Sequence, residues 1–320
     1  MQLTKKFVKA KNPCASGYKW FLRDHHGQGD YQAVLDALVA DGRVDDACWL
    51  LDQFGPTDTV LQLESIEAGA IVFAGTLQVR RGISVDTVVR AGRRIVTEGG
   101  VRAGTAIVAG ENIQAQGSIV SDGLIRAGGD IQAGWGVSAA ASLDSGGGVR
   151  AAWDVHAGQD LHAAGPIWAG QGLDVGGALH GGQGIKAGGD VCAQDALEVQ
   201  RGIQAAGSVC CGDHLEAGWG IKAGGDVAAD GAIRAGEGIE AGGRILAGAG
   251  HGIYAGLRVR MDAWEVSARV TACELPALLV SGHWAPASGQ ADTMALASIH
   301  SPPAAISSST APVKRSMPAL

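Results

Sequence analysis

Residues 128–170 read GGDIQAGWGVSAAASLDSGGGVRAAWDVHAGQDLHAAGPIWAG, with an aliphatic residue at every sixth position. The same spacing extends from Ile71 to Ile245 without exception, which amounts to thirty consecutive hexapeptides. A second small or apolar residue, usually Ala, stands two positions after each aliphatic one, and Gly commonly follows. Side chains two positions apart lie on the same face of a strand. Each hexapeptide therefore predicts a short strand with two inward residues, followed by a glycine-rich corner.

The hexapeptide spacing does not fit an α-helix. Six residues turn an α-helix through about 600°, so the aliphatic positions would be distributed around all of its sides. Glycine at this density would also destabilise a helix by up to ~1 kcal/mol per position. The repeat is therefore a repeat of strands.

The type of aliphatic residue repeats with a longer period of 18. Every third hexapeptide carries the same type, in a leucine, an isoleucine and a valine column, the last interrupted only by Leu173: Leu143, Leu161, Leu179, Leu197 and Leu215; Ile167, Ile185, Ile203, Ile221 and Ile239; Val137, Val155, Val191, Val209 and Val227. The predicted fold is therefore all-β, a three-sided parallel β-helix with 18 residues per coil. Ten such coils, spaced by ~4.8 Å, would form a rod about 50 Å long.

The order of residues within the hexapeptide resembles one known family. Left-handed hexapeptide helices of the acyltransferase type usually carry the small inward residue before the aliphatic one, whereas here it follows. In this order, and in motifs such as GGDIQAG, AGGDV and GSIVSDG, the repeat resembles the polymer-forming cytoskeletal (bactofilin-like) β-helix proteins. The resemblance covers about 175 residues and implies a right-handed helix and self-assembly. The chain departs from that family in the sizeable segment that precedes its helix.

The two ends of the chain differ from the repeat. Residues 1–60 predict a small α-helical module, with two helices around Asp41-Gly42, Asp30 as the cap of the first and Gly55-Pro56 as the end of the second. This module either caps the open N-terminal end of the β-helix or presents an adaptor surface to another protein, and it could do both.

Residues 61–284 are assigned to the β-helix, in which AWEVSARV (263–270) and LPALLVSGHW (275–284) predict C-terminal capping strands. Residues 285–320 are rich in Ser, Pro and Ala and predict a disordered tail.

Composition and charge limit the classes of partner. A net charge of −7 and a pI near 5.7 are not typical of a nucleic-acid-binding protein. No segment approaches the ~20 apolar residues of a membrane span, and the N-terminus lacks the apolar stretch of a secretory signal. Six cysteines without a small-domain spacing favour a reduced, cytoplasmic protein. No cofactor is expected.

Two histidines are the low-priority candidates for a metal site. His162 and His180 are 18 residues apart at the same outward position, so they are predicted to stack in adjacent coils. Clustered histidines bind zinc in carbonic anhydrases built from hexapeptide repeats, but zinc needs three or four ligands. The other members of this outward column are Asp144, Glu198 and Glu216. The column is therefore interpreted as a solvated polar ladder, and no metal ligand or catalytic residue is assigned.

Cys192 and Cys210 form a second stacked pair, at a spacing that is compatible with a disulfide. In a reducing compartment we expect them to be free thiols. Cys211 is predicted to point inward as a small core residue.

Large aromatic residues are the candidates for interaction. Trp135 and Trp153 are predicted to stack at one corner of the helix, and Trp168 and Trp219 lie on or near a second face. Aromatic residues exposed on a rod of Gly and Ala suggest a contact surface, although they could equally shield the corner. Two further tryptophans lie in the helical module, so the full set of interaction candidates is Trp20, Trp49, Trp135, Trp153, Trp168 and Trp219.

The sequence favours a non-enzymatic structural scaffold that associates with itself or with another protein. The first alternative is a protein-binding effector or inhibitor that acts through the helical module and the exposed tryptophans. The second is an enzyme of the hexapeptide-repeat type, a carbonic anhydrase or an acyltransferase.

Overall fold

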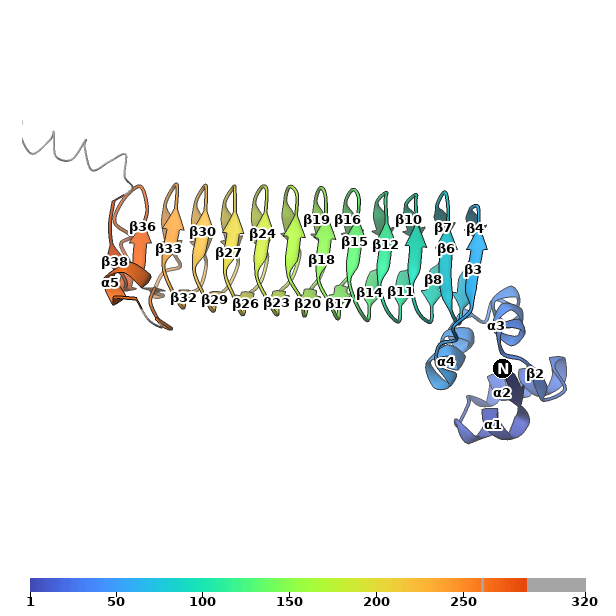
Figure 1. Ribbon diagram of the computed structural model, residues 1–320. Helices are drawn as coiled ribbons and strands as arrows, with labels where there is room; N and C mark the ends of the chain where they lie inside the picture. The colour runs from blue at the N-terminus through green and yellow to red at the C-terminus, as the bar shows by residue number, and fades with distance from the viewer. Residues whose placement is uncertain (260–261, 287–320) are drawn as a thin grey trace, which may run out of the picture.

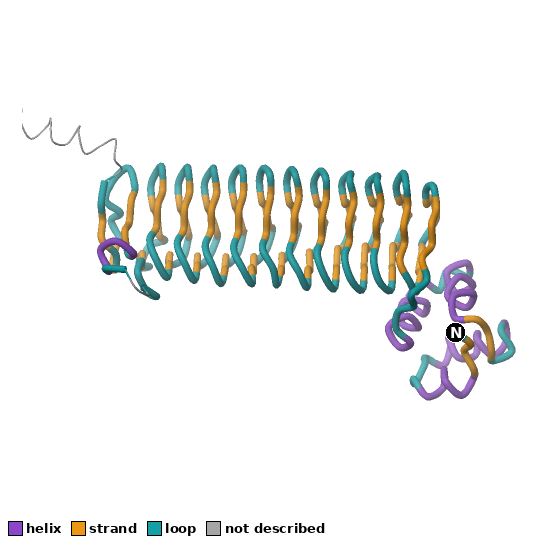
Figure 2. Tube along the Cα trace, viewed as in Figure 1, coloured by secondary structure: helices purple, strands orange, loops and turns teal. Residues whose placement is uncertain are grey.

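The computed structural model describes residues 1–259 and 262–286. Figure 1 shows a straight rod of stacked coils, with a helical module attached near the N-terminal end of the rod. Each coil consists of short strands joined by loops and turns (Figure 2). The predicted disordered tail lies, from residue 287 onward, outside the described residues.

Three parallel sheets form the sides of the rod, which confirms the three-sided β-helix. The first sheet has 11 strands: β4 (Ile66–Ala68), β7 (Ile83–Val85), β10 (Val101–Ala103), β13 (Ile119–Ser121), β16 (Val137–Ala139), β19 (Val155–Ala157), β22 (Leu173–Val175), β25 (Val191–Ala193), β28 (Val209–Cys211), β31 (Val227–Ala229) and β34 (Ile245–Ala247). The second has 12: β5 (Ile71–Phe73), β8 (Val88–Ala91), β11 (Ala106–Ala109), β14 (Leu124–Ala127), β17 (Leu143–Ser145), β20 (Leu161–Ala163), β23 (Leu179–Gly181), β26 (Leu197–Val199), β29 (Leu215–Ala217), β32 (Ile233–Ala235), β35 (Ile253–Tyr254) and β37 (Leu279–Ser281). The third has 13: β3 (Val60–Leu63), β6 (Thr76–Val79), β9 (Ile95–Thr97), β12 (Ile113–Ala115), β15 (Ile131–Ala133), β18 (Val149–Ala151), β21 (Ile167–Ala169), β24 (Ile185–Ala187), β27 (Ile203–Ala205), β30 (Ile221–Ala223), β33 (Ile239–Ala241), β36 (Arg269–Thr271) and β38 (His283–Trp284).

The register of the sheets places like residues on like, as the 18-residue period predicts. Leu161 pairs with Leu179 in the second sheet, and Ile185 pairs with Ile203 in the third. The first and third residues of a typical strand are buried and the middle residue faces outward, so the inward columns form one continuous core along the rod. Where a column is uniform, neighbouring coils fill their cross-section with side chains of the same volume.

The glycine-rich corners follow from the close stacking of the coils. A Cβ atom on Gly188 would lie 2.0 Å from the carbonyl oxygen of Gly170 in the preceding coil. At this corner a side chain on residue 188 would therefore clash with the backbone of the preceding coil.

The rod extends beyond the hexapeptides at both ends, so the prediction of ten coils was too small. Strands β3 and β4 precede Ile71, and four strands follow Ile245. One of the predicted C-terminal segments is only partly a strand: Trp264–Ser267 forms the helical turn α5, and the strand β36 begins after it, at Arg269. The coil is longer here than in the repeat. Paired residues of β33 and β36, such as Ile239 and Val270, are 31 positions apart in the sequence instead of 18.

The N-terminal module contains four helices, α1 (Lys5–Ala10), α2 (Ala15–Asp24), α3 (Tyr31–Ala40) and α4 (Val44–Phe54), and the short antiparallel pair of β1 (Gln2–Thr4) and β2 (Gln28–Asp30). The two predicted helices are α3 and α4. Asp30 caps α3 by accepting a hydrogen bond from the Gln32 amide, and α4 ends at Gly55, whose φ of 78° favours glycine. The first two helices were not predicted from the sequence.

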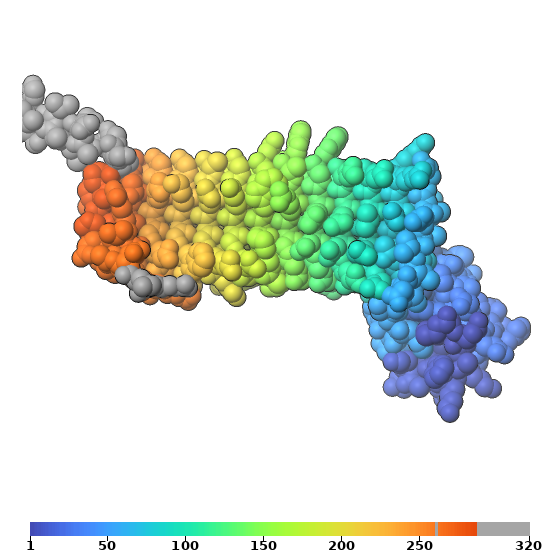
Figure 3. Space-filling view, in the orientation of Figure 1, coloured from blue at the N-terminus to red at the C-terminus, as the bar shows by residue number. Residues whose placement is uncertain are grey.

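The module packs on one sheet of the rod and leaves the other two sheet ends uncovered. Helices α3 and α4 contact β5, whose outward residue Val72 is buried in the core of the module. Strands β3 and β4, the first strands of the other two sheets, each pair with one neighbour only in the described part of the chain. In the view of Figure 3, the module projects from a corner of the rod and leaves much of its N-terminal end open.

Candidate interaction surfaces

The side chain of Gln32 joins α3 to the edge of the second sheet. Its amide nitrogen donates to the carbonyl oxygen of Val72 at 3.1 Å, and its amide oxygen accepts from the Ala74 amide at 2.9 Å. One glutamine side chain thus satisfies the Val72 carbonyl of the edge strand β5 and the Ala74 amide just after it, groups that a further strand would otherwise bind. Nearby, Asp52 of α4 forms an ion pair with Arg90, the outward residue of β8.

Strand edges and apolar side chains remain accessible at both ends of the rod. At the N-terminal end, Val60 is 52% exposed and Leu63 is 40% exposed, and both lie in the edge strand β3. At the C-terminal end, Leu246 of β34 is 42% exposed and Val280 of β37 is 65% exposed, and each strand is the last of its sheet.

The tryptophans on the rod occupy three different environments. Trp135 and Trp153 stack as predicted, with ring centroids 6.3 Å apart and planes 23° apart, and they are 62% and 55% exposed. Trp168, the outward residue of β21, is half-buried under Arg150, whose guanidinium carbon lies 4.4 Å from the ring centroid. Trp219 is 39% exposed, and Arg201 lies over its ring at 5.3 Å.

The two tryptophans of the helical module are part of its own packing. Trp20 is only 5% exposed and its indole nitrogen donates to the Asp41 carboxylate at 2.6 Å. Trp49 packs against the same core and is half-buried. Burial therefore removes Trp20 from the set of exposed contact residues.

The predicted histidine column exists in the second sheet. His162 and His180 pair in register on adjacent strands of the second sheet, and the Nδ1 atom of His180 lies 3.4 Å from the Glu198 carboxylate. Within residues 1–259 and 262–286, no group of three or more His, Cys, Asp or Glu residues has the geometry to hold a metal ion.

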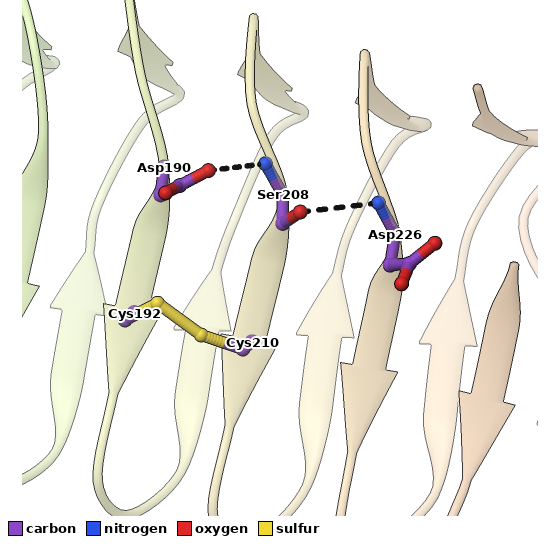
Figure 4. Close-up of a disulfide and its surroundings, with 5 residues drawn as sticks. All are labelled: Asp190, Cys192, Ser208, Cys210 and Asp226. Atoms are coloured by element: carbon purple, nitrogen blue, oxygen red, sulfur yellow. Dashed lines mark hydrogen bonds between the residues drawn. A yellow bond between two sulfur atoms is a disulfide. The ribbon is translucent and has the colours of Figure 1, made fainter. Parts of the chain in front are cut away.

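Cys192 and Cys210 form a disulfide across β25 and β28, where free thiols had been expected (Figure 4). The register explains the bond, because the two outward positions of neighbouring coils bring the Cα atoms to 4.7 Å. Cys211 points inward, as predicted, and burial raises the pKa of its thiol to about 11.

Figure 4 also shows a second type of contact between coils. The carboxylate of Asp190 accepts from the Ser208 amide at 2.6 Å, and the Ser208 hydroxyl accepts from the Asp226 amide at 3.2 Å. Six further bonds of this type join a side chain just before a strand to the amide 18 residues later; their acceptors are Asn112, Asp130, Asp154, Asp160, His214 and Asp226. The sequence signal for these bonds is the recurrent Asp directly before the aliphatic residue, as in GGDIQAG and AGGDV.

None of the described helices is long and apolar enough to cross a membrane.

Comparison with known proteins assigns only the N-terminal part of the chain. Residues 1–55 match the family model of the YdhT N-terminal domain. The matched segment contains β1, β2 and α1 to α4 and ends at Gly55, before the first strand of the rod. The comparisons with curated proteins and with solved structures gave no match. The chain is therefore a parallel β-solenoid that follows a segment similar to the YdhT N-terminal domain.

Proposed function

We propose that this protein is a non-enzymatic structural scaffold that associates with itself through the ends of its rod, as the resemblance to polymer-forming, bactofilin-like helices implies. The observation that carries the proposal is the set of edge strands at both ends, each paired on one side only among the described residues, with exposed Val60 and Leu63 at one end and Leu246 and Val280 at the other. An edge strand presents a row of unpaired backbone groups that can pair with another chain. Contact between unlike ends repeats in one direction and produces a filament unless the rotation closes a ring.

The helical module limits how two rods can meet. It covers the outward residue Val72 and, through Gln32, binds the Val72 carbonyl of β5 and the Ala74 amide after it. A head-to-tail contact would therefore use the edges of β3 and β4, and the module would flank the joint.

Sedimentation velocity across a hundredfold concentration range, together with negative-stain images, tests the proposal. We expect dimers or filaments, and we expect Val60→Lys with Leu63→Lys to reduce them, because charged residues block pairing at an edge. The matched control is Val120→Lys on the outward face of β13, in the middle of the rod. A wild-type protein that stays monomeric throughout would refute self-association.

The exposed, stacked pair of Trp135 and Trp153 favours a second candidate, a protein-binding effector. Pull-down from a lysate with the wild type and with a Trp135→Ser, Trp153→Ser variant tests it. An unchanged list of captured proteins would exclude a role for this pair.

We also propose a cytoplasmic location, on the basis of the cysteine spacing. The Cys192–Cys210 disulfide favours an oxidising compartment instead, because disulfides persist mainly there. The thiol state of this pair in cells lysed directly into an alkylating agent distinguishes the two locations.

A further inference from the structure

A groove of about 840 Å³ runs along the outer face of the third sheet. It extends over the five coils that contain β21, β24, β27, β30 and β33 and reaches β36 at the end of the rod. One side is lined by the outward residues of these strands, and the floor is made of small residues such as Ala187 and Gly188. The floor is therefore smooth and continuous in the direction of the rod axis.

The groove carries positive charge on a part of the rod that is otherwise acidic. Residues 151–286 contain 15 Asp and Glu against 8 Lys and Arg. The groove, in contrast, is lined by Lys186, Lys222 and Arg269 and by one carboxylate, Glu240, which pairs with Lys222 at 2.9 Å. Within the described residues, Lys186 and Arg269 have no carboxylate at ion-pair distance. The groove is thus complementary to an anionic ligand.

Aromatic side chains stand at the end of the groove nearer to the N-terminus. Trp168 lines the first coil of the groove, and Arg150 packs on its ring from the preceding coil. Trp135 and Trp153 follow β15 and β18 and therefore occupy the same corner in the two coils before the groove. Indole rings provide flat apolar surfaces on which a ring of the ligand can stack.

The arrangement fits a linear polymer that lies along the rod. The outward side chains of the groove recur at the spacing of adjacent coils, ~4.8 Å. They include an indole (Trp168), an amide (Gln204) and two ammonium groups. A peptide would be held weakly here, because the strand backbones are paired within the sheet and cannot accept a further strand on their face. Single-stranded nucleic acid is bound on successive aromatic platforms, whereas the coils of this groove after Trp168 present charged and amide side chains.

We propose that this face binds a linear anionic polysaccharide, with its carboxylates at Lys186 and Arg269 and one sugar ring on Trp168. Gln204, between the two lysines, donates to and accepts from hydroxyl groups. This activity goes beyond the proposed scaffold and does not depend on it, because the groove lies on a side of the rod and the self-association surfaces lie at its ends.

Isothermal titration of the full chain with polygalacturonate tests the proposal. Its methyl ester, which has the same backbone without the charge, is the ligand control. We expect binding to polygalacturonate and at least about tenfold weaker binding to the ester. Absence of binding to polygalacturonate, or equal binding to both, would overturn the proposal.

Two variants locate the site. Lys186→Gln with Arg269→Gln, and separately Trp168→Ala, should each weaken binding by about tenfold or more. The matched control, Arg102→Gln with Arg234→Gln, removes two positive charges from outward positions of the other two sheets and should leave binding unchanged. Equal loss in the control variant would mean unspecific charge attraction and would reject the groove. Tighter binding of poly-glutamate or single-stranded DNA than of polygalacturonate would reject the polysaccharide as its ligand.

Discussion

At the scale of single residues, the stacking of one coil on the next depends on two neighbouring positions. The aliphatic residue that begins a strand packs in the core, and the polar residue directly before it binds an amide of the next coil. Asp154, Asp160 and Asp190 each place a carboxylate oxygen 2.6–2.9 Å from an amide in the next coil. That amide lies at a corner, where the backbone turns away from the regular ladder of the sheet. A carboxylate is a strong acceptor for a backbone amide, so each such residue fastens one coil to the next.

Replacement of Asp190 by Ala tests this role. The Ser208 amide would lose its acceptor, and we expect a loss of about 1 kcal/mol in the free energy of unfolding, because water can replace part of the bond at an exposed corner. Urea denaturation measures the loss. The control is Asp174→Ala, which removes an outward carboxylate that is hydrogen-bonded to the half-buried His156, and should cost no more than ~0.5 kcal/mol. Equal losses in the two variants would contradict a special role of the corner position.

At the scale of elements, the contact between α3 and β5 shows how a helix can end a sheet. The Gln32 amide presents a donor and an acceptor side by side, like the backbone of a neighbouring strand, and Val72 closes the contact with an apolar side chain. The burial of Tyr31, which raises the pKa of its hydroxyl, belongs to the same contact region. The orientation of the module on the rod therefore depends on a small number of groups.

Gln32→Ala should loosen the module without unfolding the rod. The Ala74 amide would lose its acceptor and the Val72 carbonyl its donor, a cost of about 1–2 kcal/mol. Hydrogen exchange of the Ala74 amide should become faster, while amides in the middle of the rod keep their protection. Gln28→Ala is the control, because Gln28 is exposed and its strand β2 pairs with β1. Unchanged exchange at Ala74 would mean that the apolar contact alone holds the module.

The disulfide between β25 and β28 makes a second prediction at this scale. Titration of thiols in denaturant should give four per chain without reductant and six after reduction. In the native protein at about pH 8, the exposed Cys14 should react first. Cys211 should react slowly, because its raised pKa keeps the thiol protonated and the thiolate is the reactive form. Six reactive thiols in denaturant before reduction would show that the pair is not oxidised.

At the scale of the whole molecule, the sequence predicts the rod well and its ends poorly. The alternation of inward and outward residues is local, and its thirtyfold repetition determines the three faces, the stacking of Trp135 on Trp153 and the adjacency of Cys192 and Cys210. Gln32 lies in the helical module, which has no repeat, and its partners Val72 and Ala74 are some forty residues away. The spacing of residues in the sequence therefore does not predict this contact. The turn at Trp264–Ser267 escaped prediction for the same reason, because the repeat has already ended there.

The distribution of charge over the molecule leads to the last prediction. Residues 1–23 contain six Lys and Arg and no Asp or Glu, whereas residues 151–286 carry an excess of seven acidic residues. Rods that join head to tail bring these regions of neighbouring molecules toward each other. Exposed charges attract over shorter distances as salt reduces the Debye length from about 10 Å at 0.1 M to about 3 Å at 1 M. We therefore expect a lower weight-average sedimentation coefficient at 1 M salt than at 0.1 M, at one protein concentration.

A charge variant separates this attraction from pairing of the strand edges. Lys5→Gln, Lys6→Gln and Lys9→Gln together should reduce association at 0.1 M salt and have little effect at 1 M, where the attraction is already screened. These side chains belong to α1, which lies away from the contact between α3 and β5, so the fold of the rod should not change. If association is unchanged or stronger at 1 M salt, the contact between rods is formed by the apolar edges at Val60 and Val280. In that case the basic residues of segment 1–23 do not contribute to it.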